Sequence, residues 1–459
     1  MKKKFNIISL SIIFTLGAFM VSCSDKPDVY EFPVGEYFYD IPDVPVTEDY
    51  VIGVRYDRKS TDSIRASVGG TPLGDDLIWW DGGSTALRGQ WYTGTPLLGE
   101  YDTRRDSSKV IRQHMDWGRQ AGIDFFIISW GGRGYTDTIL MQFDRLWKEG
   151  DPRVVIRFDP NYLLGRTGYG NDTLMLNPGR MDTLRHDFDS LYVNVMQKQF
   201  AYKNKNTGYP VVILCEFVNK LGITDLKEFV SFFKKENKFT KEPNNLFMMG
   251  ELGGSVWTSP ENWGWHPAPG QPGHGYGQIK PDTIAAFEAV FTNDLQHSNY
   301  DRYLGQYSFL DYNYTYWRSK LAPMAKEYIP TIYPAFDNRI TSYASNQFFI
   351  PRWKESDNTA YIVSSIQEGI KAVPSLPANQ VDENGMRVGT VGTGDQYNLS
   401  NYTKNPYQQW ANVAKRNVGP SRIILVRSWN DFAQGNTLEP TKEYGVEYLN
   451  YTKRFFKRP

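Results

Sequence analysis

Eight short apolar or β-branched segments recur along the chain, and stretches with helical periodicity lie between most of them. These segments occupy residues Val51–Tyr56, Ile123–Trp130, Val154–Phe158, Pro210–Phe217, Leu246–Glu251, Ala289–Thr292, Ile329–Phe336 and Ile423–Trp429. One intervening stretch spaces Leu184, Phe188, Leu191 and Val195 by three and four residues, as one face of a helix does. Near-continuous apolar strands that alternate with helices are typical of a parallel sheet covered on both faces. Eight such units over ~400 residues predict a (β/α)8 barrel, an α/β fold, with a doubly wound open sheet as the alternative.

Long insertions follow several of the predicted strands. Residues 58–106, 253–280 and 337–356 come after strands, and a further Gly-, Pro- and Asn-rich stretch spans 373–406. Barrel enzymes build their active sites from loops at the carboxyl ends of strands, so we expect these insertions to border a site. Aromatic residues make up 15% of the chain, and their rings can stack on the flat C–H face of a sugar. The candidates in the insertions are Trp79, Trp80, Trp91, Trp257, Trp263, Trp265 and Tyr276, whose alternative role is local packing of the loops.

The amino terminus has the pattern of a processing signal. Three lysines follow Met1, the 16-residue apolar stretch Phe5–Met20 comes next, and Val21 and Ser22 precede Cys23. The stretch is short for a membrane span, and the pattern resembles a bacterial lipoprotein signal in which Cys23 becomes the lipidated first residue. An ordinary secretory signal is the alternative. The polar residues Ser24–Asp28, which follow Cys23 as a tether, resemble the surface-export signal of Bacteroidetes lipoproteins. We expect a signal peptide at 1–22, a lipidated tether at 23–47 and one barrel domain at 48–459, anchored to the outer membrane on its surface or periplasmic side.

The charge balance and the motif content exclude several classes of function. The chain has 51 Lys and Arg against 51 Asp and Glu, which argues against nucleic acid and against polybasic attachment to lipid. It lacks CxxC, HExxH, P-loop and GxSxG motifs. His266 and His274 share a loop without the spacing of a metal motif, and Cys215 lies in an apolar run typical of a buried thiol. We expect no metal, no cofactor and no nucleic-acid partner, and a monomer held at the membrane by its lipid alone.

Carboxylates stand at or just after the ends of the predicted strands. Asp159 follows the third strand, Glu216 and Glu251 lie at the ends of the fourth and fifth, and Asp337 and Asp431 follow the seventh and eighth. Because the strands of a parallel barrel end at one mouth, we expect these acids to converge there. Glycosidic cleavage needs one acid that gives a proton to the leaving oxygen and a second group that acts as base or nucleophile. The alternative for each acid is structural, as the cap of a helix or the partner of an arginine.

Three segments together resemble one family of carbohydrate-active barrels. They are residues 97–131, 332–339 and 428–440, and the last contains Ser428, Trp429, Asn430, Asp431, Gln434 and Glu439. They are similar to the first helix and second strand, the strand-seven segment and the strand-eight motif of the glycoside hydrolase family 99-like barrels. That group includes endo-α-mannosidases and related proteins encoded in O-antigen clusters. The resemblance covers roughly residues 48–457 and implies a (β/α)8 fold that takes a mannoside or other polysaccharide.

The resemblance also implies roles within the strand-eight motif. In the family this motif is Asn-Glu-aromatic-x-Glu-Gly. Its first glutamate is the base that helps the sugar 2-hydroxyl to attack the anomeric carbon, and its second is the general acid. Here the two positions hold Asp431 and Gln434. Aspartate is one methylene shorter, and a carboxamide has no proton to give near neutral pH, although it can donate a hydrogen bond. General acid catalysis is typically worth ~10²–10⁴-fold, so a hydrolase of this type needs a substitute acid.

Three functions remain open for such a site. The first is a hydrolase with Asp431 as base, Gln434 at the scissile oxygen and a substitute acid, for which Glu251, Glu216 and Glu439 are the candidates. The second is a surface protein that binds glycans without cleaving them, and the third is a structural or partner-binding lipoprotein whose cleft is incidental. In the first two functions the expected sugar contacts are Asp337, Asn338, Arg339, Asn430, Glu439, Trp130, Trp263, Trp265 and Trp91. We expect the first function, with a polysaccharide or oligosaccharide as the partner.

Overall fold

The described part of the chain belongs almost entirely to one compact unit. The computed structural model describes residues 39–60, 77–79, 94–99, 101–103, 105–132, 135–159, 163, 178–215, 226–255, 284, 286–294, 307–337, 349–361 and 402–459. The chain divides into Met1–Asp40 and Ile41–Pro459, and the second unit contains every described helix and strand. Within these described ranges, no helix has the length and apolar character that crossing a membrane requires. The predicted signal peptide and Cys23 lie outside the described residues, so the ranges 1–22, 23–47 and 48–459 stay predictions.

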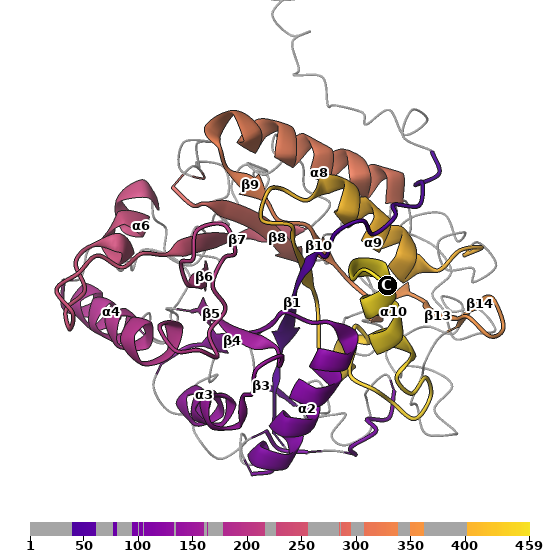
Figure 1. Ribbon diagram of the computed structural model, residues 1–459, viewed down its shortest axis with the longest axis horizontal. Helices are drawn as coiled ribbons and strands as arrows, with labels where there is room; N and C mark the ends of the chain where they lie inside the picture. Colours follow the sequence, from indigo (N-terminus) through magenta and orange to yellow (C-terminus); the bar gives the residue numbers. More distant parts are fainter. Residues whose placement is uncertain are drawn as a thin grey trace, which may run out of the picture. The chain divides into compact units, whose positions relative to one another are not determined.

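A parallel sheet forms the centre of the second unit (Figure 1). In the order in which they pair, its strands are β10 Thr331–Ile332, β15 Ile423–Val426, β1 Val51–Tyr56, β4 Phe125–Trp130, β5 Arg153–Phe158, β6 Val211–Leu214, β7 Phe247–Ser255, β8 Ala289–Asp294 and β9 Glu327–Tyr328. Only Ile329 and Pro330 separate β9 from β10. The Ile329 amide donates to Val290 of β8, and the Leu425 amide of β15 donates to Pro330. β9 and β10 therefore form one interrupted strand between β8 and β15, which closes an eight-stranded barrel and confirms the predicted fold.

The observed strands agree with the predicted ones except at some of their ends. The seventh strand runs from Glu327 to Ile332 rather than over 329–336, and Pro330 interrupts it because proline has no amide hydrogen for the ladder. The eighth strand ends at Val426 rather than at Trp429, because the Ser428 amide no longer bonds to a neighbouring strand and donates to Asn436 of the loop that follows. The sixth strand, the shortest of the predicted set, is present as β8.

Helices surround the barrel, as Figure 1 shows. They are α2 Ser107–Ala121, α3 Tyr135–Leu146, α4 Pro178–Leu191 with the π-helical turn η5 Tyr192–Met196, α6 Leu226–Lys234, α8 Tyr307–Leu321 with the 3-10 turn η9 Ala322–Met324, α9 Pro406–Asn417 and α10 Glu447–Phe456. A second 3-10 turn, η13, spans Phe432–Gln434. Three small ladders complete the described structure: β2 Arg58–Ser60 with β3 Leu77–Trp79, β11 Phe336–Asp337 with β12 Phe349–Ile350, and β13 Arg352–Lys354 with β14 Thr359–Tyr361.

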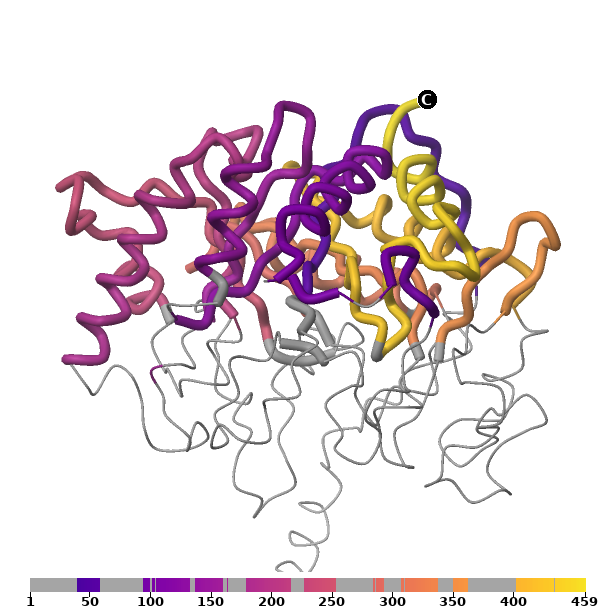
Figure 2. The backbone as a smooth tube through the Cα atoms, turned by 90° about the horizontal axis from the view of Figure 1, so that it is seen from below, coloured from indigo at the N-terminus to yellow at the C-terminus, as the bar shows by residue number. Residues whose placement is uncertain are grey.

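The segment before β1 and the end of the chain lie side by side at the amino-terminal side of the barrel. Figure 2 shows the carboxyl terminus beside the indigo segment that leads into β1, where the Tyr50 amide donates to Phe456 at 3.0 Å. Before this point the chain lies along α9. The side-chain amide of Asn412 donates to Asp43 at 2.8 Å, and the Lys415 ammonium donates to the Val44 carbonyl at 2.6 Å. The last residues of the predicted tether therefore contact the barrel domain.

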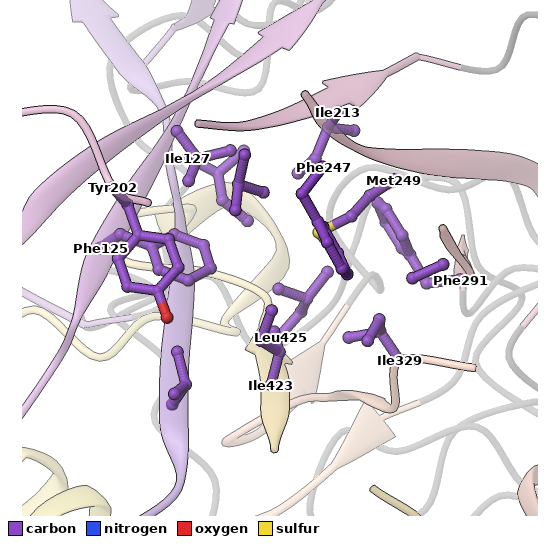
Figure 3. Close-up of a cluster of buried hydrophobic side chains, with 14 residues drawn as sticks. Phe125, Ile127, Tyr202, Ile213, Phe247, Met249, Phe291, Ile329, Ile423 and Leu425 are labelled. Atoms are coloured by element: carbon purple, nitrogen blue, oxygen red, sulfur yellow. The ribbon is translucent and has the colours of Figure 1, made fainter. Parts of the chain in front are cut away.

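An apolar cluster fills the barrel interior on the amino-terminal side of the strands (Figure 3). Its members come from the inward positions of all eight strands and from the loop before β6, and they are Val51, Phe125, Ile127, Val155, Tyr202, Val211, Ile213, Phe247, Met249, Ala289, Phe291, Ile329, Ile423 and Leu425. We call this cluster the barrel floor. Gly53 leaves room for it, because a Cβ there would lie 2.2 Å from Cε2 of Phe125. Burial of these side chains supplies the main driving force for closing the barrel.

Candidate functional site

A polar layer follows the floor where the strands end. Because inward positions recur every second residue, the inward residues after Ile127, Val155 and Met249 are polar: Ser129, Arg157 and Glu251. The Arg157 guanidinium donates through Nε to Oε2 of Glu251, through Nη2 to Oε1 at 3.0 Å, and through Nη1 to the Ser129 hydroxyl at 3.1 Å. Strand β6 lies between β5 and β7, so the Arg157–Glu251 pair links two strands that do not pair with each other. We call these three residues the mouth layer.

The geometry of the mouth layer bears on the predicted role of Glu251. Both of its carboxylate oxygens accept from one guanidinium, and both side chains are about 97% buried, with exposures of 3% and 2%. A bidentate arginine partner favours the ionised carboxylate. The arrangement therefore suits a negative charge that stabilises a developing cation better than it suits a proton donor. Arg157 was not predicted from the sequence, although its place two residues after inward Val155 marks it as inward.

The residues that follow β15 fold into a tightly bonded loop. Trp429 is fully buried, and its ring lies edge-on to Phe126 and His114, with centroids 5.2 and 5.4 Å away. Its amide donates to the Arg55 carbonyl of β1 at 2.7 Å, and its carbonyl accepts from the Thr437 hydroxyl at 2.6 Å. The tryptophan of the strand-eight motif thus anchors the loop in the wall between β1, β4 and α2.

Asp431 begins the 3-10 turn η13. Its Oδ1 accepts from the Gln434 amide at 3.3 Å, its own amide donates to the Ser428 hydroxyl at 2.8 Å, and Gly435 ends the turn in the left-handed region at φ 62°. Within the described residues, Oδ2 of Asp431 accepts no hydrogen bond. The two motif positions are therefore coupled through the cap, and the described part of the fold uses only one of the two carboxylate oxygens. Asp431 is buried and Gln434 is half-buried.

Asn430 and Glu439, two predicted sugar contacts, lie in a buried network instead. The Asn430 amide nitrogen donates to the Asp57 carbonyl at 3.0 Å and to the Tyr101 hydroxyl at 2.9 Å, and its oxygen accepts from the Asp57 amide at 2.8 Å. The Tyr101 hydroxyl donates to Glu439 Oε2 at 2.6 Å, and Nε2 of His114 lies 3.3 Å from Oε1. Asn430, Glu439 and His114 are fully buried. These contacts support a bracing role for Asn430 and Glu439, so neither the predicted sugar contacts nor Glu439 as substitute acid gains support.

The protonation of Tyr101 follows from its surroundings. Burial raises the pKa of the Tyr101 hydroxyl well above its usual range, and the nearby negative charge of Glu439 raises it further. The hydroxyl therefore keeps its proton and donates to the carboxylate over the physiological range. His114 of α2 is also part of this network, because its Nδ1 lies 3.0 Å from the Tyr56 hydroxyl.

Trp130 lies in the barrel wall and faces away from the interior. Its ring stacks on Phe158 with centroids 5.4 Å apart, and its indole N–H donates to Asp137 of α3 at 2.9 Å. It borders a cavity of about 250 Å³ between α3 and the α4–η5 segment. The prediction that Trp130 contacts a ligand at the mouth gains no support from this position: Trp130 follows inward Ser129 by one residue, so the alternation of the strand turns it outward.

The remaining predicted site residues lie outside what the structure describes. These are Glu216, Asn338, Arg339, Trp91, Trp263 and Trp265, and for Asp337 only the backbone, in β11, is described. Among the described residues, no group of three His, Cys, Asp or Glu side chains is placed to hold a metal ion. Cys215 is a buried free thiol, as the apolar run around it predicts.

Comparison with known proteins supports the fold and one segment of the chain. A protein-family model described as Glycosyltransferase WbsX matches residues 383–452, which include the loop after β15. A solved structure described as a glycoside hydrolase-like protein is 16% identical, with a TM-score of 0.57 over 92% of this chain and 98% of that one. The GH99 endo-α-mannosidase from Bacteroides thetaiotaomicron is 13% identical, with a TM-score of 0.50 over 89% of this chain and 96% of that one. No curated protein sequence matches the chain. The likeness to family 99-type barrels is thus confirmed for the fold.

Proposed function

We propose that this protein acts on a glycan at the barrel mouth as a glycoside hydrolase-like enzyme, with Asp431 as the base. The observation that carries the proposal is the state of Asp431: one oxygen caps η13, and within the described residues the other accepts no hydrogen bond. The cap fixes the carboxylate in a loop at the carboxyl end of a barrel strand, where barrel enzymes place catalytic groups. The fold likeness to a GH99 endo-α-mannosidase supports a mannoside or related polysaccharide as the substrate class.

The proposal needs an acid, because Gln434 has no proton to give. Glu251 is paired with Arg157, and Glu439 is fully buried beneath Tyr101. Of the three predicted substitutes we therefore assign the role to Glu216, which follows β6. Gln434 would then bind the oxygen of the scissile bond. Asp337, Asn338 and Arg339 would contact sugar hydroxyls, and Trp91, Trp263 and Trp265 would stack on the rings.

Glycan binding without cleavage is the second candidate, and Gln434 itself favours it. A carboxamide at the acid position can hold an oligosaccharide by hydrogen bonds while leaving the glycosidic bond intact. The two candidates differ in one result. Screening the purified chain on a glycan array, with product analysis of every ligand found, gives cleavage for the first and retention of intact glycan for the second. A Gln434→Glu variant that gains activity would identify a hydrolase that lost its acid.

The variant Asp431→Asn tests whether Asp431 acts as a base while it keeps the side-chain cap of η13. Asparagine is as good a cap as aspartate, so the unfolding midpoint should stay within error of the wild type. It is no base, so turnover should fall by ~10²–10⁴-fold. Asp431→Ala is the matched variant that also loses the cap and should be less stable by about 1 kcal/mol. Unchanged turnover in both variants would remove Asp431 from the site.

We also propose that the protein is a monomeric lipoprotein of the outer membrane, facing the cell surface or the periplasm. The amino-terminal pattern that ends at Cys23 supports this location. Fractionation of cells that carry Cys23→Ser checks it: the variant should leave the membrane fraction, and an unchanged distribution would count against the anchor.

A further inference from the structure

A continuous path of buried polar groups leads from the barrel wall to the proposed base. It starts at the Tyr56 hydroxyl of β1, passes through His114 of α2 and Glu439 to Tyr101, and ends at Asn430, the neighbour of Asp431. Each side chain on this path is at least 97% buried, with exposures of 0–3%. The path joins segments that are more than 300 residues apart in sequence, so it holds the loop after β15 against the first strand and helix.

Hydrogen bonds join the path at both of its ends, and a close contact joins its middle. Glu439 accepts from the Tyr101 hydroxyl on Oε2, and its Oε1 lies 3.3 Å from Nε2 of His114 without the geometry of a hydrogen bond. On the other side of the imidazole ring, Nδ1 of His114 lies 3.0 Å from the Tyr56 hydroxyl. Tyr101 also accepts from the Asn430 amide, whose second hydrogen goes to the Asp57 carbonyl. Both amide hydrogens of Asn430 are thus fixed, and the orientation of Asn430 is determined.

Packing alone would favour apolar side chains at the positions of Glu439 and Tyr101. A buried carboxylate is costly, and apolar side chains of similar volume often replace such groups without loss of stability. A phenylalanine at position 101 would fill the same space as the tyrosine ring. What only the hydroxyl supplies is the link between Glu439 and Asn430. Polar groups that are costly to bury are most useful where geometry must be fixed.

We infer that Tyr101, His114 and Glu439 are positioning residues that fix Asn430 and, through it, the Asp431–Gln434 turn. The inference rests on the proposed function for its catalytic consequence, but its structural consequence can be measured without any ligand. Loss of the Tyr101 hydroxyl would leave Asn430 with only its two hydrogen bonds to the Asp57 backbone and would loosen the turn that carries Asp431. A displacement of about 1 Å at a catalytic group can cost on the order of 100-fold in rate.

The test compares Tyr101→Phe with Tyr328→Phe in the purified full chain. Tyr328 is a matched control, because it is also fully buried and its hydroxyl lies 2.8 Å from that of Thr292, on strands away from the loop. Both variants lose one buried hydroxyl and should unfold at similarly lowered midpoints. Only Tyr101→Phe should show faster hydrogen exchange in peptides covering residues 428–439. With mannan oligosaccharides as the probe, only Tyr101→Phe should lose turnover on the order of 100-fold, mainly in kcat.

The outcomes separate the inference from the proposed function. If the wild type neither binds nor cleaves the oligosaccharides or any array glycan, the proposed function fails, and the exchange data alone decide the inference. If exchange over 428–439 is the same in both variants, the positioning role is overturned, whatever the activity. If the wild type is active and Tyr101→Phe matches Tyr328→Phe in kcat, the catalytic consequence is also overturned.

Discussion

The floor and the mouth layer are built on the same strands, and they stabilise the barrel in opposite ways. At the floor, Phe125, Phe247 and Met249 are fully or nearly fully buried in an apolar cluster whose one hydroxyl belongs to Tyr202. Two residues further along β5 and β7, Arg157 and Glu251 are equally buried but satisfy each other by charge. Alternation decides which side chains point inward, and it does not decide their chemistry. At the polar end of the interior, the inward positions therefore hold charged side chains, which are more costly to bury than apolar ones and are suited to a functional site.

The largest expected effect is at the floor. Phe125→Ala should lower the free energy of unfolding by about 3–5 kcal/mol, because it removes a ring packed against Tyr202 at 4.6 Å between centroids and leaves a cavity above Gly53. Chemical denaturation measures this change. Phe239→Ala, at a side chain that is 50% exposed, is the control and should stay within about 0.5 kcal/mol of the wild type. Equal effects in the two variants would mean that the floor is not the main core.

The mouth pair should respond to single and double substitutions differently from the floor. Glu251→Gln removes the counter-charge that both guanidinium nitrogens contact, and it should cost about 3 kcal/mol of unfolding free energy. The double variant Arg157→Met/Glu251→Met should lose less than the single one, because no charge is then left buried. Denaturant unfolding of the wild type, the single variant and the double variant checks this. If the double variant loses as much stability as the single one or more, a charge left buried without its partner is not the source of the loss, and the mouth is held by packing as the floor is.

The sequence predicts the barrel and its inward positions, but it does not predict the contacts between residues that are far apart along the chain. The strand periods predict the barrel, and the same period contains the signals for inward Arg157 and outward Trp130. The acids at the strand ends predict a site, but only the alternation along each strand indicates that Arg157 points inward and Trp130 points outward. The network around Glu439 is different in kind. Its partner Tyr101 lies 338 residues away, and Glu439 follows an irregular loop without any period. No spacing rule connects two such residues, so only the folded chain shows that Glu439 is braced.

The same limit explains the mixed outcome for the strand-eight motif. Its form predicts a loop at the barrel mouth, and the loop is there, with Asp431 at its turn. The motif could not show how its residues are divided between scaffold and site. Trp429 and Asn430 anchor and brace the loop, whereas Asp431 both caps the turn and keeps one oxygen unused among the described contacts. A short motif can therefore be specific for a fold while most of its residues serve the backbone.

The smallest effect near neutral pH, and the most selective one, concerns the single hydroxyl of the floor. Burial raises the pKa of Tyr202 in the folded chain, and the charge of Asp124 raises it further. Tyrosine in the unfolded chain loses its proton near pH 10, so above this pH the folded state binds more protons than the unfolded state. Stability must then fall as pH rises, by up to about 1.4 kcal/mol per pH unit for one such group.

Tyr202→Phe removes this contribution and nothing else that titrates. Its unfolding free energy should differ little from that of the wild type at pH 7–9, and it should exceed the wild-type value increasingly from pH 10 to 11. The other buried tyrosines are present in both proteins, so their contributions cancel in the difference. Denaturant unfolding at half-unit steps of pH measures it. Parallel curves would show that Tyr202 ionises in the folded chain as easily as in the unfolded one, and then the floor is open to water and does not differ from the mouth in the way proposed.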